Sequence, residues 1–184
     1  MEWHFLLLVA LAAFFAGAFP FDDILASALK SAGGIFGPRS ISFVKVCANI
    51  LKGWFVVYAA CLLHPDAAYV AALMVFLGHV FPPQEGFRGG NGMGTLLGVM
   101  TGLHPVLGLV ALISWLFTYY VYRYACLAAV VATAMTPLIS AILDFGVPLP
   151  LLITFVIIVF WRHRICAARL TDGTEKMVDW DHAA

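Results

Sequence analysis

The residues best suited to chemistry gather in one glycine-rich stretch, residues 78–98, which reads GHVFPPQEGFRGGNGMGTLLG. It holds seven glycines together with His79, Arg88 and Asn91. Glycine allows a backbone to turn freely and to approach a ligand closely. The free N–H groups of such a loop can form an anion-binding concavity, and a helix that begins just after the loop adds the positive end of its dipole. Because the residues from Thr95 onward predict such a helix, the stretch predicts a seat for a phosphate group.

The composition of the chain indicates an integral membrane protein. Of its 184 residues, 63% are hydrophobic and 11% are charged, and the mean hydropathy is +0.98. A soluble domain is roughly half apolar and roughly a quarter charged. The formal net charge is zero, so that nucleic acid as a partner has no support and membrane lipid is the expected surrounding.

The apolar segments can be counted against the thickness of a bilayer, whose core of about 30 Å needs ~20 apolar residues in a helix. Seven segments are found, at residues 3–21, 42–63, 67–81, 94–103, 105–121, 125–143 and 147–162. The third and the fourth are too short to cross upright, and they flank the glycine-rich stretch. The sequence therefore predicts an all-α integral membrane protein with seven hydrophobic helical segments. We expect a single transmembrane domain over residues 1–170 and a polar cytoplasmic tail over 171–184.

The basic residues predict the orientation of these segments. Lys and Arg occur in or beside the first, third and fifth connections and after the last span, whereas the intervening turns contain none. Because Lys and Arg concentrate in cytoplasmic loops, this pattern places the N-terminus outside and the C-terminus in the cytoplasm. Three polar clusters then share one membrane face. They are the first loop, the central glycine-rich loop, and the fifth connection together with the tail. A positive pocket at that face would suit a phosphorylated substrate whose acyl chain lies in the bilayer.

Each candidate side chain also has a simpler explanation. Lys52 lies inside the second segment, where a lysine costs about 2.5 to 3.5 kcal/mol at mid-bilayer, so that a role in a site competes with snorkelling to the surface. Asn49 is one helical turn away and could share its face. His79 either donates a hydrogen bond to a bound phosphate or hydroxyl, or caps a backbone carbonyl. Arg88 and Arg39 either bind phosphate or simply follow the charge rule for cytoplasmic loops.

The glycines and the cysteines also have both a functional and a simpler structural explanation. The consecutive pair Gly89 and Gly90 favours a loop, whereas the GxxxG spacing of Gly94 and Gly98 favours close helix packing. The four cysteines are widely spaced and form no CxxC pair, so we expect small apolar packing residues rather than a metal or redox site. These cysteines are Cys47, Cys61, Cys126 and Cys166.

Four motifs occur together in a characteristic order. GHVFP and FRGGNGMGTLLG form the central one, and the others are NILKG at residues 49–53, YRYACLAA at 122–129 and WRHRICAARL at 161–170. Together they resemble the motifs of the bacterial acyl-phosphate:glycerol-3-phosphate acyltransferases, the PlsY family, whose central motif reads GHx[FY]P and then FKGGKGVAT. The resemblance covers nearly the whole chain, including the layout of seven spans.

The resemblance implies a function at the cytoplasmic face of the bacterial inner membrane. In this family acyl phosphate donates a fatty acyl group to the 1-hydroxyl of glycerol-3-phosphate, giving lysophosphatidic acid, without a metal or another cofactor. The motif loops bind phosphate, and a serine and a histidine lie near the chemistry. By position His163 matches that histidine, as a general base or as an interfacial residue among arginines. Cys126 stands at the position of the serine, as a nucleophile or as a packing residue.

The chain departs from the family pattern at several of these positions. The first family motif, GSGNxGATN, is lost, and the chain there is shorter than in the family, with GGIFGPRSISFVK at residues 33–45. Asn91 stands where the central motif has its second lysine, and Cys166 stands at the asparagine that follows the tail histidine. Asn91 carries no formal charge, and charge-assisted hydrogen bonds are about twice as strong as neutral ones, so phosphate binding should be weakened.

Two functions from different classes remain open on the sequence. As an enzyme, the protein would bind phosphate and hold the acyl carbonyl near His79, His163 or Cys126. The expected phosphate-binding residues are Arg39, Lys52, Arg88, Gly89, Gly90, Asn91 and Gly92. As an inactive relative, it would serve as a structural or lipid-binding subunit of a larger membrane complex.

Overall fold

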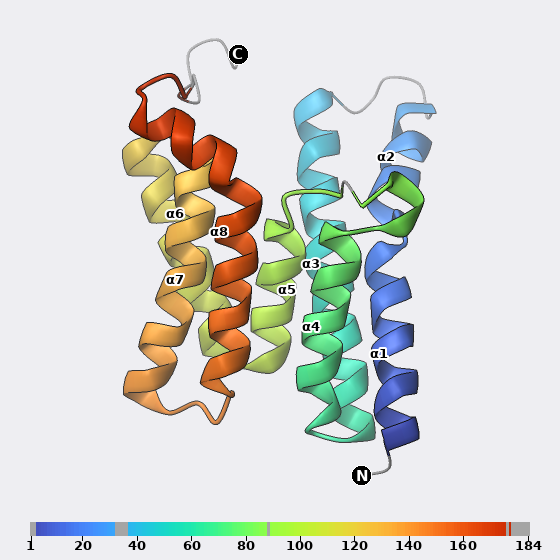
Figure 1. Cartoon of the computed structure of the whole chain (residues 1–184). Helices are drawn as coiled ribbons and strands as arrows, with labels where there is room; N and C mark the ends of the chain where they lie inside the picture. The colour runs from blue at the N-terminus through green and yellow to red at the C-terminus, as the bar shows by residue number, and fades with distance from the viewer. Residues whose placement is uncertain (1–2, 32–36, 88, 176, 178–184) are drawn as a thin grey trace. The chain divides into compact units, whose positions relative to one another are not determined.

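The secondary structure of the described part of the chain is all helical. The computed structural model describes residues 3–31, 37–87, 89–175 and 177, and the side chains of Pro38 and Arg39 lie outside that description. Over these residues there are eight α-helices, one 3-10 turn and no strand (Figure 1). The helices are α1 (Trp3–Ala18), α2 (Phe21–Ser31), α3 (Pro38–Leu63), α4 (Ala67–Val80), α5 (Met93–Leu103), α6 (Pro105–Tyr122), α7 (Ala125–Leu143) and α8 (Leu149–Thr171), and the 3-10 turn is Pro83–Glu85. The predicted all-α membrane fold is confirmed.

Six helical stretches of the described chain are long and apolar enough to cross a membrane. They are Trp3–Ser31, Ser40–Leu63, Ala67–Glu85, Pro105–Tyr122, Ala125–Leu143 and Leu149–Thr171. The helix α5 is apolar but shorter, as the sequence predicted for the segment that follows the glycine-rich stretch. The third segment gains length from the 3-10 turn, so that it reaches 19 residues through Glu85.

Two compact units make up the chain, residues 1–103 and residues 104–184. In the first unit α1 packs against α4, and α3 packs against α5. The helix α4 also contacts both α3 and α5. The amphipathic helix α2 packs on α3. In the second unit α7 packs against both α6 and α8. The prediction of a single transmembrane domain over residues 1–170 stays a prediction.

Glycines mark the points where helices of the first unit touch. A Cβ atom on Gly98 of α5 would lie 2.0 Å from the carbonyl oxygen of Ile50 on α3, and one on Gly53 of α3 would lie 2.4 Å from the carbonyl oxygen of Thr95. Only glycine therefore permits this backbone approach. Close helix packing, which the GxxxG spacing favoured, is confirmed for Gly98.

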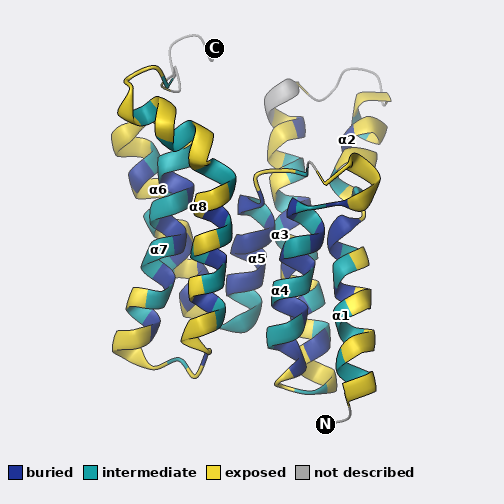
Figure 2. Ribbon diagram, in the orientation of Figure 1, coloured by how far each residue is buried: buried dark blue, intermediate teal, exposed yellow. Residues whose placement is uncertain are grey.

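The burial pattern places apolar side chains both inside the units and on their surfaces (Figure 2). Phe76 and Leu96 are fully buried, whereas Leu8, Phe55 and Phe117 are at least 63% exposed. Large exposed apolar side chains in such number are unfavourable in water and are expected where the surrounding medium is lipid.

Inside α7, Pro137 cannot donate the usual backbone hydrogen bond, which leaves the carbonyl of Thr133 without its normal partner. The Thr136 hydroxyl donates to that carbonyl at 2.8 Å, and the Thr133 hydroxyl donates to the carbonyl of Ala129 at 2.7 Å. The carbonyl that Pro137 leaves unpaired is thus satisfied by a side chain, as a membrane helix requires.

Two elements differ from the sequence prediction. The helix α2 lies between the first two predicted segments, where the sequence predicted no helix, and α8 continues to Thr171, beyond the predicted end of the last segment at residue 162. Both differences have one cause. Counting apolar residues finds the part of a helix that sits in hydrocarbon, and it misses charged helical turns at the membrane surface.

Candidate functional site

A polar cavity of about 300 Å³ lies within the first unit, where the end of α1, the start of α2, α3, the end of α4 and the glycine-rich loop come together. It is lined by Gly17, Ala18, Phe19, Pro20, Asp22, Asp23, Lys45, Lys52, His79, Pro82, Glu85, Gly89 and Gly90. Four of the sequence candidates, Lys52, His79, Gly89 and Gly90, are therefore brought together.

Lys52 is held at the end of α1. Its ammonium group donates to the carbonyl oxygens of Gly17 at 3.0 Å and Phe19 at 3.4 Å, and its Nζ lies 3.3 Å from His79 Nδ1. The last carbonyls of a helix lack partners within the helix and carry the negative end of its dipole. The side chain of Gln84 donates to the carbonyl of Ala18 in the same cluster. Lys52 therefore anchors α1 to α3 and also places a positive charge on the cavity wall.

The contact with Lys52 determines which nitrogen of His79 carries a proton. An ammonium group can only donate, so Nδ1 must accept and a neutral imidazole carries its proton on Nε2. That nitrogen faces Gly90, because a Cβ atom on Gly90 would lie 3.0 Å from it. His79 can thus present an N–H donor toward a phosphate or hydroxyl oxygen in the cavity.

The glycine-rich loop folds back on the end of α4. The Gly89 N–H donates to the carbonyl of Val80 at 3.2 Å, and a Cβ atom on Gly89 would lie 2.2 Å from the His79 carbonyl oxygen. Gly92 has a φ of +78°, which favours glycine, and it lies against Phe76. The loop can therefore approach the cavity only with glycine at these positions.

Asn91 takes a structural position at the start of α5. Its Oδ1 accepts a hydrogen bond from the backbone N–H of Met93 at 3.3 Å. Such a bond satisfies one of the unpaired donors at a helix start, and α5 consequently begins two residues before the predicted start at Thr95. Asn91 and Gly92 are not among the residues that line the polar cavity.

Four charged residues of the cavity were not among the site residues that the sequence predicted. Lys45 Nζ lies 2.6 Å from Asp23 Oδ1 and 3.9 Å from Asp22 Oδ2, and Glu85 also lines the cavity. In the structure the acidic pair lies in the first turn of α2, where carboxylates interact favourably with the helix dipole. Their closeness to Lys45 depends on α2 packing on α3, which no local pattern shows.

An apolar groove begins where the polar cavity ends. A second cavity of about 500 Å³ shares Phe19 and Lys52 with the polar one and is otherwise lined by apolar residues of α1, α2 and α3. A third, of about 210 Å³, shares Ala16, Phe55 and Val56 with the second and continues between α1 and α3 to Leu63. Lys52 thus stands at the boundary between a polar chamber and an apolar track.

The second unit holds the other histidine candidate. His163 Nδ1 lies 2.9 Å from the carbonyl oxygen of Val159, one turn earlier on α8. Since a carbonyl only accepts, Nδ1 carries the proton, and Nε2 is the nitrogen that can take up another. The geometry of His163 itself is therefore compatible with a general base.

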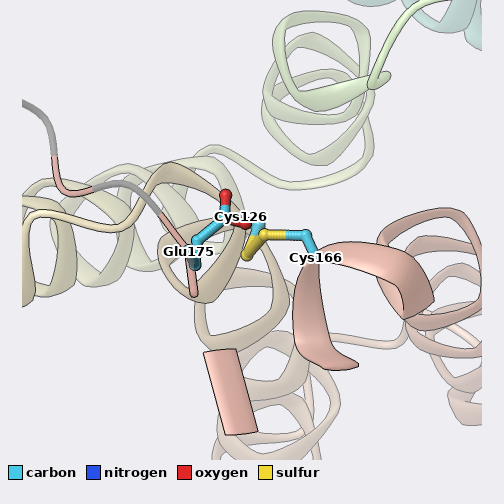
Figure 3. Close-up of side chains that lie close together, drawn as sticks. All are labelled: Cys126, Cys166 and Glu175. Atoms are coloured by element: carbon cyan, nitrogen blue, oxygen red, sulfur yellow. A yellow bond between two sulfur atoms is a disulfide. The ribbon is translucent and has the colours of Figure 1, made fainter. Parts of the chain in front are cut away.

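The structure corrects the prediction that all four cysteines are apolar packing residues. Cys126 of α7 and Cys166 of α8 form a disulfide, with Cα atoms 6.5 Å apart (Figure 3). Cys47 and Cys61 are free. The pairing was missed because the two residues are 40 positions apart and meet only when α7 and α8 pack. A bonded Cys126 has no thiolate with which to act as a nucleophile.

The remaining candidates stay predictions. Arg88 lies outside the described residues, as does the side chain of Arg39. Asn49 is buried against Gly94 of α5 and does not line the cavity, and its Oδ1 has no hydrogen-bond partner among the described residues.

Comparison with known proteins places the chain in a family. The model of the family described as glycerol-3-phosphate acyltransferase matches residues 35–173. This chain belongs to that family. A glycerol-3-phosphate acyltransferase of Burkholderia cenocepacia is 31% identical over 194 residues, covering 94% of this chain and 91% of the relative. One of Burkholderia multivorans is 32% identical over 193 residues, with the same coverage.

Solved structures of the family share the fold. A crystal structure of PlsY, an integral membrane glycerol 3-phosphate acyltransferase, in its glycerol 3-phosphate form matches with a TM-score of 0.82. The match has 24% identity and covers 97% of this chain and 98% of the other. Its lysophosphatidic acid form matches with a TM-score of 0.80 at 24% identity, covering 95% of each chain. The resemblance stated from the motifs is thereby confirmed, and the chain is a multi-pass integral membrane protein of the glycerol-3-phosphate acyltransferase family.

Proposed function

We propose that this protein is a membrane glycerol-3-phosphate acyltransferase that uses acyl phosphate as its donor. The observation that carries the proposal, beside family membership, is the junction at Lys52 between a polar cavity and an apolar groove. Both substrates carry a phosphate group, and one of them also carries an alkyl chain. A site for them needs a cation and N–H donors at the polar end and an apolar track beyond it.

The polar cavity offers suitable groups for phosphate. Lys52 supplies the charge, His79 supplies an N–H from Nε2, and Gly89 and Gly90 allow a ligand to approach the backbone. Arg88 and Arg39 remain candidates to add positive charge to this site. The carboxylates of Asp22 and Asp23 repel a phosphate, and the ion pair with Lys45 offsets part of that repulsion.

The proposed reaction is an acyl transfer without a covalent enzyme intermediate. The 1-hydroxyl oxygen of glycerol-3-phosphate forms an ester bond with the acyl carbon, and the bond between that carbon and the phosphate oxygen breaks. The hydroxyl proton passes to a base, for which the motif resemblance offers His163 as a candidate, and inorganic phosphate leaves. Lys52 stabilises the negative charge that develops on the leaving group. Placement of the two substrates side by side supplies much of the acceleration.

The proposed location is the bacterial inner membrane, with the polar cavity open to the cytoplasm. The N-terminus would lie outside and the C-terminus in the cytoplasm, as the distribution of Lys and Arg predicts. The comparisons lend no support to the alternative of an inactive structural or lipid-binding subunit of a larger membrane complex.

A direct assay tests the proposal. Purified protein in lipid nanodiscs is given acyl phosphate and isotopically labelled glycerol-3-phosphate, and labelled lysophosphatidic acid and released phosphate are measured together. We expect the two products in a one-to-one ratio, and no product when the acyl phosphate is omitted. Folded protein that gives background turnover and binds neither substrate would overturn the proposal and favour the structural subunit.

A further inference from the structure

The bonded cysteines lie at the open end of a helical hairpin. The helices α7 and α8 are joined by a short turn over residues 144–148. Cys126 lies near the start of α7 and Cys166 near the end of α8, so that both lie at the end of the hairpin away from that turn. A bond at this position restrains the ends that the turn leaves free to separate. We propose that Cys126 and Cys166 form a reversible thiol–disulfide site that reacts with small-molecule disulfides and thiols of the glutathione class.

The surroundings of the pair are suited to exchange chemistry. Cys126 is the second residue of α7, where the positive end of the helix dipole stabilises a thiolate. Both cysteine residues are half-buried, but their sulfur atoms are buried, so that a small reagent reaches them when the ends of α7 and α8 part. The sequence around them is basic, with Arg123 beside α7 and Arg162 and Arg164 on α8.

This basic end predicts the compartment that the pair faces. Lys and Arg concentrate on the cytoplasmic side of membrane proteins, and cytoplasmic thiols are kept reduced by small thiols and thioredoxin-type proteins. A cysteine pair that is close enough to bond in such a compartment therefore changes state with the thiol balance around it. A permanent structural bond is the expectation for the opposite side of the membrane.

A carboxylate beside the pair favours the bonded state. An oxygen atom of Glu175 and the two sulfur atoms lie within 4.8 Å of one another (Figure 3). The backbone N–H of Glu175 donates to the carbonyl of Arg169 at 3.1 Å, and its carboxylate pairs with the Arg169 side chain at 2.5 Å. A negative carboxylate opposes the charge of two thiolates more than that of a neutral disulfide.

The exchange proceeds in two balanced steps. The Cys126 thiolate attacks a sulfur atom of a small-molecule disulfide, a mixed disulfide forms, and one small thiolate leaves. The Cys166 thiolate then attacks the Cys126 sulfur, the protein disulfide forms, and the second small thiolate leaves. Two electrons pass from the cysteine pair to the small-molecule disulfide, and the two thiol protons pass to the released thiolates. Two small thiols reverse the process.

Whether the two cysteines are bonded or reduced affects the part of α8 that carries His163. That histidine precedes Cys166 by three residues, so that both lie on one face of α8. The bonded state fixes this part of α8 to α7, and the reduced state releases it. The inference of a thiol–disulfide site itself does not rest on the proposed acyl transfer, because its test reads thiols and not turnover.

The test uses protein in which only the pair remains, the double variant Cys47→Ala and Cys61→Ala in nanodiscs. The protein is equilibrated in glutathione buffers of graded oxidation, quenched with acid, denatured and labelled with a maleimide polymer that shifts its mobility on a gel. We expect a single reversible transition from no adduct to two adducts as the buffer becomes more reducing. Adding Cys166→Ser to the double variant is the matched control and should give one adduct in a strongly reducing buffer.

Three outcomes would overturn the inference. Two adducts in every buffer would mean that the pair does not bond. No adduct even after equilibration with excess glutathione would mean a permanent structural bond. One zinc ion per chain in metal analysis of the reduced protein, with thiols that then resist oxidation, would mean a metal site formed with Glu175.

Discussion

Lys52 shows how one side chain can have a structural and a chemical role together. A lysine within an apolar helix is costly, and the structure offsets that cost by directing the ammonium group to the carbonyls of Gly17 and Phe19 at the end of α1. The same group contacts His79 and lines the polar cavity. The two explanations that the sequence left open, snorkelling and a site, are therefore compatible, because the surface to which Lys52 reaches is a cavity wall.

Replacement of Lys52 should separate these roles. We expect Lys52→Ala to weaken binding of glycerol-3-phosphate by about 10- to 100-fold, since a hydrogen bond to a charged group contributes about 1.5 to 3 kcal/mol. Calorimetric titration measures the affinity, and thermal unfolding in detergent measures the loss of the contacts to α1. Lys30→Ala, an exposed lysine on α2, is the control and should change neither. Unchanged affinity in Lys52→Ala would remove Lys52 from the site.

His163 is the residue for which a kinetic test is most informative. If Nε2 accepts the hydroxyl proton, His163→Ala should lower kcat by about 10²- to 10⁴-fold and leave the KM for glycerol-3-phosphate nearly unchanged. Initial rates at varied substrate concentration measure both. His64→Ala, at the turn between α3 and α4, should behave as the unaltered protein. A normal kcat in His163→Ala would assign the residue to the membrane interface.

At the scale of elements, contacts between bare backbones organise the first unit. Gly17 and Gly78 allow α1 to touch α4, because a Cβ atom on either would come within 2.1 Å of a carbonyl oxygen on the other helix. Gly53 and Gly98 do the same for α3 and α5. These crossings bring the end of α1 to Lys52 on α3, and they bring the glycine-rich loop to the end of α4. The cavity is a consequence of this packing.

The crossing of α3 and α5 should therefore be sensitive to a single methyl group. We expect Gly98→Ala to destabilise the protein by about 1 to 3 kcal/mol, because the helices must separate to admit the Cβ atom. Thermal unfolding in a fixed detergent measures the change. Gly37→Ala is the matched control, since a Cβ atom there has nothing within 4 Å. Equal stability of the two variants would contradict the close crossing.

The apolar groove between α1 and α3 should set the length of the acyl chain, if the proposed function holds. Ala59 lines the groove beyond Phe55, as seen from Lys52. We expect Ala59→Phe to lower turnover with long acyl phosphates at least 10-fold more than with short ones, because the larger ring fills the track. Rates with a series of chain lengths measure the effect. Phe117→Ala, on the exposed face of α6, is the control. An equal loss for every length would show that the chain lies elsewhere.

At the scale of the whole molecule, each unit carries its basic residues toward one end. In the first unit Lys30 and Lys45 lie at the end that bears the cavity, whereas the turn with Asp66 has no Lys or Arg. In the second unit the arginines of α8 lie in its second half, and the turn over residues 144–148 has none. Each unit thus carries the charge asymmetry that orients membrane helices.

This asymmetry predicts which side of the membrane each end faces. Single cysteines at Lys30 and Arg164 should be labelled by an impermeant maleimide only from the cytoplasmic side, and cysteines at Asp66 and Asp144 only from the outside. The measurement uses inverted and right-side-out vesicles, with the native cysteines replaced by alanine. Labelling of the two units from opposite sides, or of the whole chain in reverse, would contradict the predicted topology.

The sequence by itself determined the class of the protein, the number and approximate limits of its apolar helices, the family, and the loop that approaches the site. These features depend on local composition, because a bilayer acts on each segment according to its own residues and a motif is a local string. The need for glycine at Gly92 and the close crossing at Gly98 could be anticipated for the same reason.

Tertiary structure alone decided which distant residues meet. The contact of Lys52 with the end of α1, the ion pair between Lys45 and Asp23, and the bond between Cys126 and Cys166 each join two helices. Such contacts depend on which face of one helix turns toward another, and many pairings satisfy the same hydrophobic pattern. The cavity, its acidic wall and its junction with the apolar groove follow from one of those pairings, so no stretch of sequence contains them.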